Sequence, residues 1–419
     1  MISPTPAPPR VERPEWRRWV TPAALRQKPV HRWFVLAHSF TSELVHALVK
    51  EWEIGPSQCV LDPFLGAGTT VVAAQELGIP AYGFDLSPLA VFASRVKAGT
   101  RDLDLGRIEA AWGALRLRLM RLTPCPPRRE YAPLVKRALA GAALGLCEAV
   151  ALEIDGLQCR EIERDFFRLA LLSTLPRHST ALATGGWLKW AESERSGEQV
   201  SRTFTNLVEV MLEDLRQRMP TSPIPAWTIG KADARRLPLP DACVDAVITS
   251  PPYPNRHDYT RVYGIELLFG FLDWEGARSL RYQSFHSHPE ARPDRPPAPD
   301  YSPPRSLCAV TAYLRAHECD LRIPRMLDGY FLDMHICLRE VARVCVPGAR
   351  VALVLGNAQY LGQPVAVDEL TAEVGEQAGL QCKGFMVART RGNSAQQMKQ
   401  FGIRPSRETV VLFMKSGLP

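Results

Sequence analysis

The sequence predicts an α/β fold whose central sheet is mainly parallel with an antiparallel edge. Short apolar runs alternate with helix-length segments over residues 35–100, and the same alternation returns from residue 226 onward. The early runs end in polar residues, as Cys59-Val60-Leu61 ends at Asp62. Strands that alternate with helices pair in parallel through right-handed crossovers. The last two apolar runs have only a basic loop between them, which favours an antiparallel pair at the edge.

The N-terminal part predicts an arm followed by a strand–helix–strand unit. Residues 1–34 are rich in Pro and Arg and have no clear periodicity, so we expect an arm. Apolar side chains recur at helical spacing between Leu44 and Val49, and Pro88 suits the first turn of a helix. The expected elements are the arm 1–34, helix 41–52, strand 59–61, helix 69–77, strand 81–84 and a helix that begins at Ser87-Pro88.

Two segments interrupt the alternation. Residues 101–225 carry Leu, Ala, Arg and Glu at helical spacing and predict a largely helical insertion. Residues 263–325 are rich in Pro, Arg and His and predict an irregular loop insertion. The α/β domain then comprises residues 35–100 and 226–419. Its later elements are strands 227–229 and 244–248, helix 326–343, strand 350–355, helix 368–378 and strands 382–388 and 409–414.

Composition narrows the class of protein. A length of 419 residues allows two or three domains, and a formal net charge of +7 suits a polyanionic partner. No apolar run approaches the length of a membrane span, and the N-terminus lacks the pattern of a secretory signal. The ten cysteines are scattered without metal-ligand spacing. We therefore expect a cytoplasmic protein with reduced thiols and no metal site; His286-x-His288 alone is too little for one.

A Gly-rich loop after the first strand predicts a nucleoside site. Gly66 and Gly68 let a ligand approach the backbone, and the amides of the following helix point toward it. Asp85 ends the next strand about twenty residues on, where a carboxylate commonly binds ribose hydroxyls. Asp233 follows a third strand and suits an adenine amine. The loop lacks the third glycine of dinucleotide sites and the Lys-Ser/Thr ending of ATPases, although a simple tight turn explains the glycines equally.

Ser250-Pro251-Pro252-Tyr253 predicts a rigid clamp for a planar base that bears an exocyclic amine. Two prolines fix two φ angles and hold the flanking side chains in place. The Ser250 hydroxyl and the Pro251 carbonyl would accept hydrogen bonds from the amine, which draws its lone pair out of conjugation. Tyr253 offers a stacking face, worth roughly 1–3 kcal/mol per base. A base in a duplex would have to flip out to reach this clamp. Alone, the motif also fits an ordinary turn.

Together, the segment from Asp62 to Thr70 and the Ser250–Tyr253 segment resemble the DNA amino-methyltransferases. The closest likeness is to the cytosine-N4-specific enzymes of bacterial restriction-modification systems. The resemblance covers residues 35–100, 228–262 and 326–415. It implies a seven-stranded Rossmann-like fold, S-adenosylmethionine as methyl donor and site-specific transfer to the N4 amine of a flipped-out cytosine. Ser at position 250 favours cytosine, since adenine enzymes more often carry Asp there, and the motif order here is the reverse of many cytosine-N4 enzymes.

The resemblance also assigns roles to residues. Cofactor binding is expected from Ser39, Phe40, Thr41, Asp62, Pro63, Phe64, Gly66, Gly68, Thr69, Thr70, Asp85, Leu86, Asp233 and Ala234. Catalysis is expected from Ser250, Pro251, Pro252 and Tyr253. DNA contacts are expected on grounds other than the resemblance, from residues that follow the clamp and from a basic loop near the C-terminus: Arg256, His257, Tyr259, Arg261, Arg281 and Arg391. The two insertions, which the resemblance does not cover, are candidate DNA-recognition regions.

Other functions remain open at this point. The chain could instead methylate adenine N6 in DNA or a guanine amine in RNA, or bind DNA without catalysis. Cytosine-C5 methylation is disfavoured, because Pro124-Cys125 lacks the context of a cysteine nucleophile. The expected partners are duplex DNA and a restriction endonuclease for the same site. We expect a monomer or weak dimer in a bacterial or archaeal cytoplasm.

Overall fold

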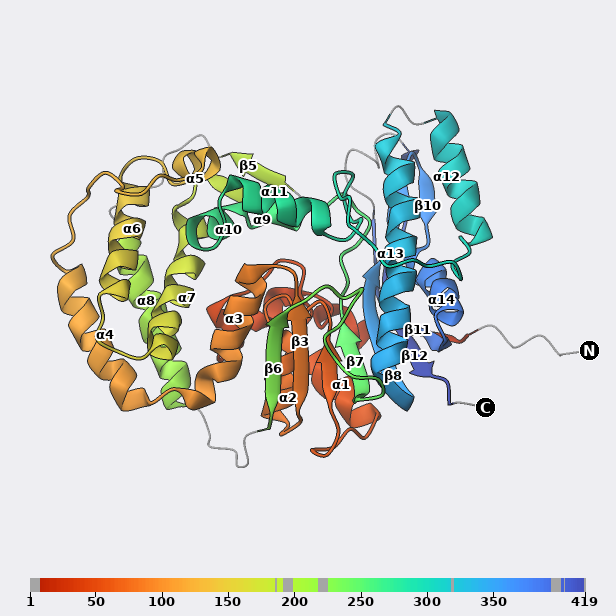
Figure 1. Ribbon diagram of the computed structural model, residues 1–419, viewed down its shortest axis with the longest axis horizontal. Helices are drawn as coiled ribbons and strands as arrows, with labels where there is room; N and C mark the ends of the chain where they lie inside the picture. Colours follow the sequence, from red (N-terminus) through yellow and green to blue (C-terminus); the bar gives the residue numbers. More distant parts are fainter. Residues whose placement is uncertain are drawn as a thin grey trace, which may run out of the picture.

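The computed structural model describes residues 8–184, 187–190, 199–217, 225–317, 320–392, 401–402 and 404–417. These residues form an eight-stranded sheet in the order β1-β11-β12-β8-β7-β2-β3-β6 (Figure 1). The strands are β1 (Arg10–Glu12), β2 (Val60–Asp62), β3 (Ala81–Asp85), β6 (Trp227–Lys231), β7 (Val244–Thr249), β8 (Cys345–Gly356), β11 (Leu380–Arg391) and β12 (Ser406–Lys415).

Five neighbouring strands, from β6 to β8, are parallel, and β12 runs antiparallel to both β8 and β11. This arrangement confirms the predicted α/β fold and its antiparallel pair. The outer edge, however, is β1, which pairs in parallel with Phe385–Val387 of β11. Three residues between prolines carry no periodic signal, so the sequence placed β1 in an irregular arm. Residues 1–7 of that arm lie outside the described part.

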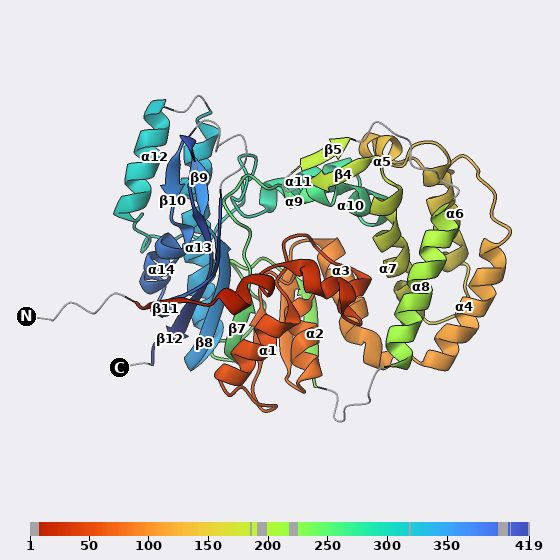
Figure 2. The ribbon, with the colours of Figure 1, turned by 180° about the vertical axis from the view of Figure 1, so that it is seen from behind.

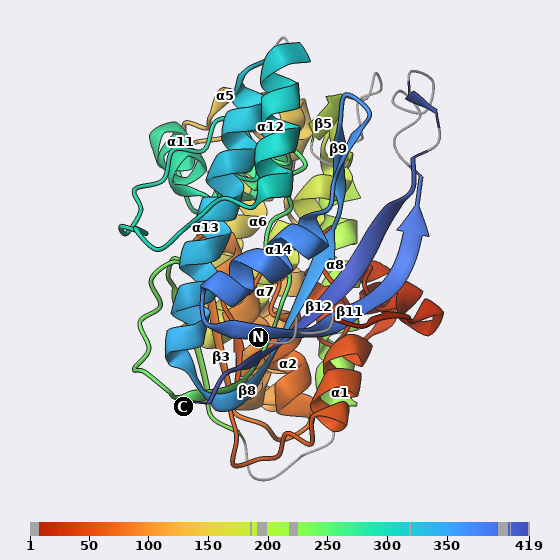
Figure 3. The ribbon, with the colours of Figure 1, turned by 90° about the vertical axis from the view of Figure 1, so that its right-hand side faces the viewer.

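The two faces of the sheet bury alternate residues of each strand, as the two-residue period of a strand requires. Val60, Ile248 and Ala352 pack with α1 (Ser42–Glu51) and α2 (Thr69–Glu76). Their neighbours in sequence pack on the other face with α13 (Arg322–Val344) and α14 (Val367–Gln377). Figure 3 shows α13 and α14 on one side of β8 and α1 on the other. The predicted elements of this domain are therefore confirmed within a few residues.

A helical lobe lies beside the sheet (Figures 1 and 2). Its helices share one hydrophobic core, and Asp214 in this lobe accepts hydrogen bonds from the backbone of Val30 and from the indole of Trp33, at 3.0 and 2.8 Å. The buried Asp214 thus ties the N-terminal arm to the lobe. The helices are α3 (Pro88–Ala98), α4 (Leu105–Leu119), α5 (Pro133–Ala138), α6 (Ala142–Asp155), α7 (Glu161–His178) and α8 (Val200–Arg216), with β4 (Ala181–Thr184) and β5 (Trp187–Trp190) at one end.

The segment predicted as irregular contains helices. It includes the short helices α10 (Gly264–Gly270) and α11 (Trp274–Gln283), and α9 (Tyr259–Val262) directly precedes it. All three lie above the strand ends and join the helical lobe (Figure 2). Helix α12 (Arg305–His317) packs along α13 instead. Helices this short, separated by Pro-rich chain, give weak periodic signals. A small hairpin of β9 (Ala358–Tyr360) and β10 (Gln363–Val365) completes the described strands. The remaining elements are short 3-10 helices, of which η1 (Pro14–Arg18), η2 (Pro22–Gln27) and η3 (His31–Trp33) lie in the arm predicted to be irregular, and η4 (Gly99–Asp102) follows α3. None of the described helices is long and apolar enough to cross a membrane.

Candidate active site

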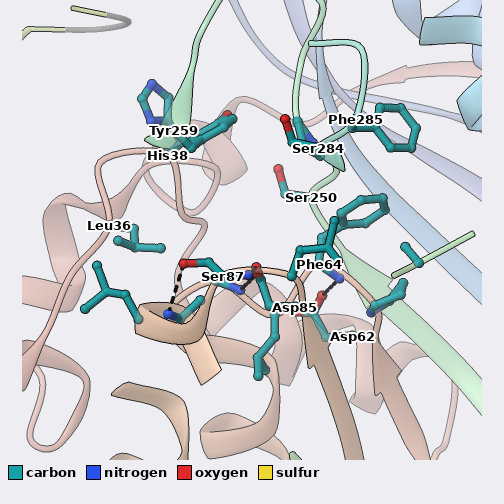
Figure 4. A pocket seen from close by; sticks show the side chains of 18 of the residues that line it. Leu36, His38, Asp62, Phe64, Asp85, Ser87, Ser250, Tyr259, Ser284 and Phe285 are labelled. Atoms are coloured by element: carbon teal, nitrogen blue, oxygen red, sulfur yellow. Dashed lines mark hydrogen bonds between the residues drawn. The ribbon is translucent and has the colours of Figure 1, made fainter. Parts of the chain in front are cut away.

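Four parallel strands end at one cavity. Asp62 ends β2, Asp85 ends β3, Asp233 follows β6 and Ser250 follows β7, and all four line the same space. Ligands of open α/β sheets bind at the carboxyl ends of the strands. Figure 4 shows Ser250 between Asp85 on one side and the Tyr259 and Ser284 side chains on the other. The two motifs recognised in the sequence therefore meet in one pocket.

Asp85 organises the cofactor end of this cavity. One carboxylate oxygen accepts from the Gly66 amide at 2.9 Å, and the other accepts from the Ser87 amide at 2.8 Å. The Ser87 hydroxyl in turn caps α3. Burial raises the pKa of Asp85 to about 6, against the pull of these backbone hydrogen bonds. Each carboxylate oxygen retains a lone pair for a ligand hydroxyl.

Asp62 has a different role from Asp85, because its oxygens are committed within the protein. It accepts from Thr249 Oγ1 at 2.6 Å, from Thr70 Oγ1 at 2.7 Å and from the Phe64 amide at 3.1 Å. Burial raises its pKa to about 6 while the three donors lower it. Asp62 thus fastens the Gly-rich loop and α2 to the last residue of β7, directly before Ser250.

The two glycines of the loop differ in function. Gly66 has φ of 52° and lines the cavity. Gly68 has φ of 80° and lies away from the cavity lining; a Cβ there would come within 2.7 Å of Ser94 Oγ and 3.1 Å of Ser94 Cα. Gly68 therefore permits α2 to approach α3, and only Gly66 opens the backbone to a ligand.

Asp233 is held by an arginine fork. Arg235 is 3% exposed and contacts both oxygens of Asp233, at 2.9 and 2.6 Å. The same guanidinium donates to Asp333 on α13 at 3.1 Å, and Asp333 also accepts from His286. This buried chain of charges fixes the Asp233 side of the cavity relative to α13.

At the base end, Ser250 and Pro252 line the cavity, whereas Pro251 and Tyr253 do not. The Ser250 hydroxyl donates to the Val354 carbonyl at 3.3 Å, which leaves its lone pairs available. The Tyr253 ring packs so closely on Gly356 that a Cβ there would lie 2.9 Å away. Burial is the main reason that the pKa of the Tyr253 phenol is raised.

The structure brings most predicted cofactor residues to the cavity. Those that line it are Ser39, Phe40, Asp62, Pro63, Phe64, Gly66, Thr69, Asp85, Leu86, Asp233 and Ala234, whereas Thr41, Gly68 and Thr70 lie behind it. Thr41 and Thr70 are fully buried, and Thr70 acts through Asp62.

Five of the six residues expected to contact DNA separate into three groups, and the sixth, His257, is half-buried against His38. Arg261 and Arg281 form ion pairs with Glu290 and Asp258, so their charges are already compensated. Arg256 and Arg391 are exposed. Tyr259 lines the cavity itself. The guanidinium groups of Arg256 and Arg391 are therefore more accessible to a DNA phosphate than those of the ion-paired arginines.

Several lining residues were missed by the sequence reasoning. They come from the segment before α1 and from α9–α11 with the residues that follow them: Leu36, Thr260, Tyr263, Leu267, Leu280, Ser284 and Phe285. The close spacing of Tyr259 and Tyr263 after the clamp was the available signal, since side chains four apart share a helical face.

Comparisons with known proteins agree with this geometry. A family model described as DNA methylase, of the N6/N4 methyltransferase type, matches residues 26–93. The chain is 27% identical to Type II methyltransferase M.BsoBI of Geobacillus stearothermophilus, covering 95% of this chain and 88% of that protein. It is 26% identical to Type II methyltransferase M.AvaI of Nostoc sp., covering 95% and 89%.

These comparisons support the assignment of the chain to the DNA amino-methyltransferases of restriction-modification type. The resemblance that the motifs indicated is confirmed by these comparisons. They leave open whether the methylated base is cytosine or adenine. Among solved structures the chain is similar to TrmN from Thermus thermophilus, at 14% identity and a TM-score of 0.28 over 89% of this chain and 48% of that one. The rRNA methyltransferase aviRa from Streptomyces viridochromogenes gives 11% identity and a TM-score of 0.31, over 94% and 93%. These low scores add nothing to the assignment.

The side chains that line the cavity fit S-adenosylmethionine, the methyl donor that the resemblance to DNA amino-methyltransferases implies. Asp85 has acceptor capacity for ribose hydroxyls, and Asp233 has it for an amine. Leu36, Phe40 and Leu86 supply apolar walls. Asp62 and Asp85 leave the cavity acidic at neutral pH, which suits a cationic sulfonium.

Proposed function

We propose that this enzyme transfers a methyl group to the N4 amine of a flipped-out cytosine at a specific site in duplex DNA. The observation that carries the proposal is that Ser250 shares one cavity with Asp85 (Figure 4). A hydroxyl at this position, where a carboxylate would suit adenine enzymes, supports cytosine. The similarity to two Type II methyltransferases over nearly the whole chain supports a DNA substrate and a cognate restriction endonuclease.

The side chains provide the chemistry by positioning. The Ser250 hydroxyl donates to Val354, and its oxygen lines the cavity, where it can accept a hydrogen bond from the exocyclic amine. The Pro251 carbonyl is the second expected acceptor. Two acceptors on one amine draw the nitrogen lone pair away from the ring, which makes the nitrogen a nucleophile. S-adenosylmethionine supplies the electrophilic methyl group when bound, and in-line placement contributes most of the rate enhancement.

Aromatic side chains prepare the space for an extruded base. Tyr259 and Phe285 line the cavity on opposite sides of Ser250 (Figure 4). Tyr253 lies outside the cavity lining, with its ring packed on Gly356. A base that leaves the duplex loses its stacking, and contact with such rings replaces roughly 1–3 kcal/mol per base.

The proposal is tested by sequencing genomic DNA from cells that express this chain with a method that reports modified bases. The expected result is N4-methylcytosine at one recurring sequence, and a Ser250→Ala strain should lack it. N6-methyladenine at a recurring sequence would establish the adenine alternative instead. Unmodified DNA, with folded protein present in the cells, would contradict both.

A further inference from the structure

Two histidines from distant parts of the chain meet beside the Ser250 end of the cavity. His38 precedes α1 and lines the cavity, and His257 follows the Ser250–Tyr253 clamp. Their ring centroids lie 4.8 Å apart at 59°. His38 also meets Tyr259 edge-on at 5.4 Å, and Figure 4 shows this pair across from Asp85 with Ser250 between them. His38 therefore lies on the cavity wall near the space expected for the flipped base, and His257 packs against it from outside the lining.

Each imidazole has a buried nitrogen that lacks a hydrogen-bond partner among the described residues. The Nδ1 atoms of His38 and His257 are buried and have no hydrogen-bond partner among the residues that the structure describes. Buried polar atoms of folded proteins are almost always paired, so two such atoms on packed rings, one of which lines the cavity, indicate a group that arrives with a ligand.

The electrostatic surroundings keep these rings neutral. Burial is the main cause that lowers the pKa of each, and it lowers the pKa of His257 to about 4. The Arg391 guanidinium lowers both further, and His38 lowers that of His257. A neutral imidazole has one N–H donor and one acceptor, and its tautomer adapts to the ligand.

A cytosine would complement this arrangement. Its Watson–Crick edge carries the amine, then the N3 acceptor, then the O2 acceptor. Ser250 and the Pro251 carbonyl supply acceptors for the amine, so the adjacent N3 requires a donor. We infer that His257, packed in place by His38, donates a hydrogen bond to N3 of the flipped cytosine and helps to select that base. This inference rests on the proposed function and extends it to a specificity-determining residue that the motifs do not include.

The test compares methyl transfer in a single turnover to duplexes in which the target is cytosine or 3-deazacytosine, where a C–H replaces N3. The ratio of the two rates is measured for the full chain and for each variant. Because the intrinsic reactivity of the analogue is the same for every variant, the change in ratio reports the N3 contact alone. His257→Ala should reduce the ratio by roughly tenfold, the effect of one lost hydrogen bond.

Matched variants make the result specific. His257→Asn places an amide N–H near the Nδ1 position and should keep most of the ratio, whereas His38→Ala should reduce it less than His257→Ala. His317→Ala, on the exposed end of α12, is the control that should leave rates unchanged. Circular dichroism establishes that each variant folds.

The outcomes separate the two claims. If the unaltered chain methylates cytosine but His257→Ala keeps the full preference for cytosine over 3-deazacytosine, the histidine inference is wrong and the proposed function stands. If the unaltered chain methylates adenine and no cytosine, the proposed function itself is wrong.

Discussion

Asp62 links the two halves of the site through single hydrogen bonds. Its carboxylate joins Thr70 at the start of α2 to Thr249 at the end of β7. The residue expected to hold the cofactor therefore also sets the position of the clamp. These two roles account for a fully buried carboxylate at this position, although burial raises its pKa to about 6.

Thr249→Val should disrupt this link, since it removes one donor to a buried carboxylate. We expect a loss of roughly 1–3 kcal/mol in unfolding free energy, and a fall in methyl transfer larger than any change in cofactor affinity. Denaturant unfolding, calorimetry and single-turnover rates measure the three quantities. Thr249→Ser keeps the hydroxyl and should restore them. Equal behaviour of the Val and Ser variants would show that the hydrogen bond is unimportant.

Asp85 predicts a pH dependence of cofactor binding. Its folded pKa of about 6 lies above the ordinary 3.8, so the ionised group destabilises the fold at neutral pH, and this penalty is relieved as the pH falls through about 6. Ribose hydroxyls donate to the ionised form, so affinity for S-adenosylmethionine should weaken as the pH falls from about 7 to about 5, approaching tenfold per unit below the pKa.

Calorimetry across that pH range measures the effect. Asp85→Asn should bind weakly at neutral pH and lose most of the pH dependence, leaving only the part due to Asp62, whose pKa is also raised to about 6. An unchanged pH profile in Asp85→Asn would mean that another group controls binding.

Ser250→Ala should separate catalysis from cofactor binding. It removes an acceptor for the amine, so methyl transfer should fall roughly tenfold to hundredfold, about 1.4–2.7 kcal/mol in activation free energy. The affinity for S-adenosylmethionine should stay the same, because Asp85 and Gly66 are untouched. Ser279→Ala, on the exposed side of α11, is the control. Full activity of Ser250→Ala would remove the hydroxyl from the mechanism.

At the scale of elements, the contact between α2 and α3 depends on Gly68. Gly68→Ala places a Cβ within 3.1 Å of the Ser94 Cα at a φ of 80°, so we expect destabilisation of about 1–3 kcal/mol. Gly113→Ala in the exposed middle of α4, where nothing lies within 4 Å, should instead stabilise by about 0.5–1 kcal/mol. Thermal unfolding of both variants measures the contrast. Two equal effects would contradict the assignment of Gly68 to helix packing.

Most strands of the parallel part of the sheet could be predicted from the sequence. Strands β2, β3, β6 and β7 were predictable, because each is a short apolar run that ends in a polar residue. That regularity also placed Asp62, Asp85, Asp233 and Ser250 at one edge. Strand β1 was not predictable, since its three residues carry no periodic signal and are identified as a strand by their pairing with β11.

The residues of α9–α11 that cover the cavity, here called its roof, could not be predicted from the sequence either. Tyr263, Leu267 and Phe285 line it from short helices or the loop after them. Their position depends on long-range packing against the helical lobe, and local periodicity carries no information about such contacts. Gly68 was misassigned for a related reason: a glycine required by a neighbouring helix looks the same in sequence as one required by a ligand.

At the scale of the molecule, the cavity lies where the sheet meets the helical lobe. The strand ends form its floor and α9–α11 its roof (Figures 1 and 2). The chain returns from β7 directly into α9, so the clamp and the roof are continuous in sequence. A base that enters between them would contact Ser250 and the roof together, which suits recognition of one extruded nucleotide.

The central claim is methyl transfer to cytosine N4, and the nature of the methylated nucleoside tests it most directly. Purified chain is incubated with duplex DNA and methyl-labelled S-adenosylmethionine, and the DNA is digested to nucleosides and separated by chromatography. If cytosine N4 is the acceptor, the label co-migrates with N4-methyldeoxycytidine, and Ser250→Ala sharply reduces the amount of label. Label in N6-methyldeoxyadenosine, or in no nucleoside despite cofactor binding, would contradict this claim.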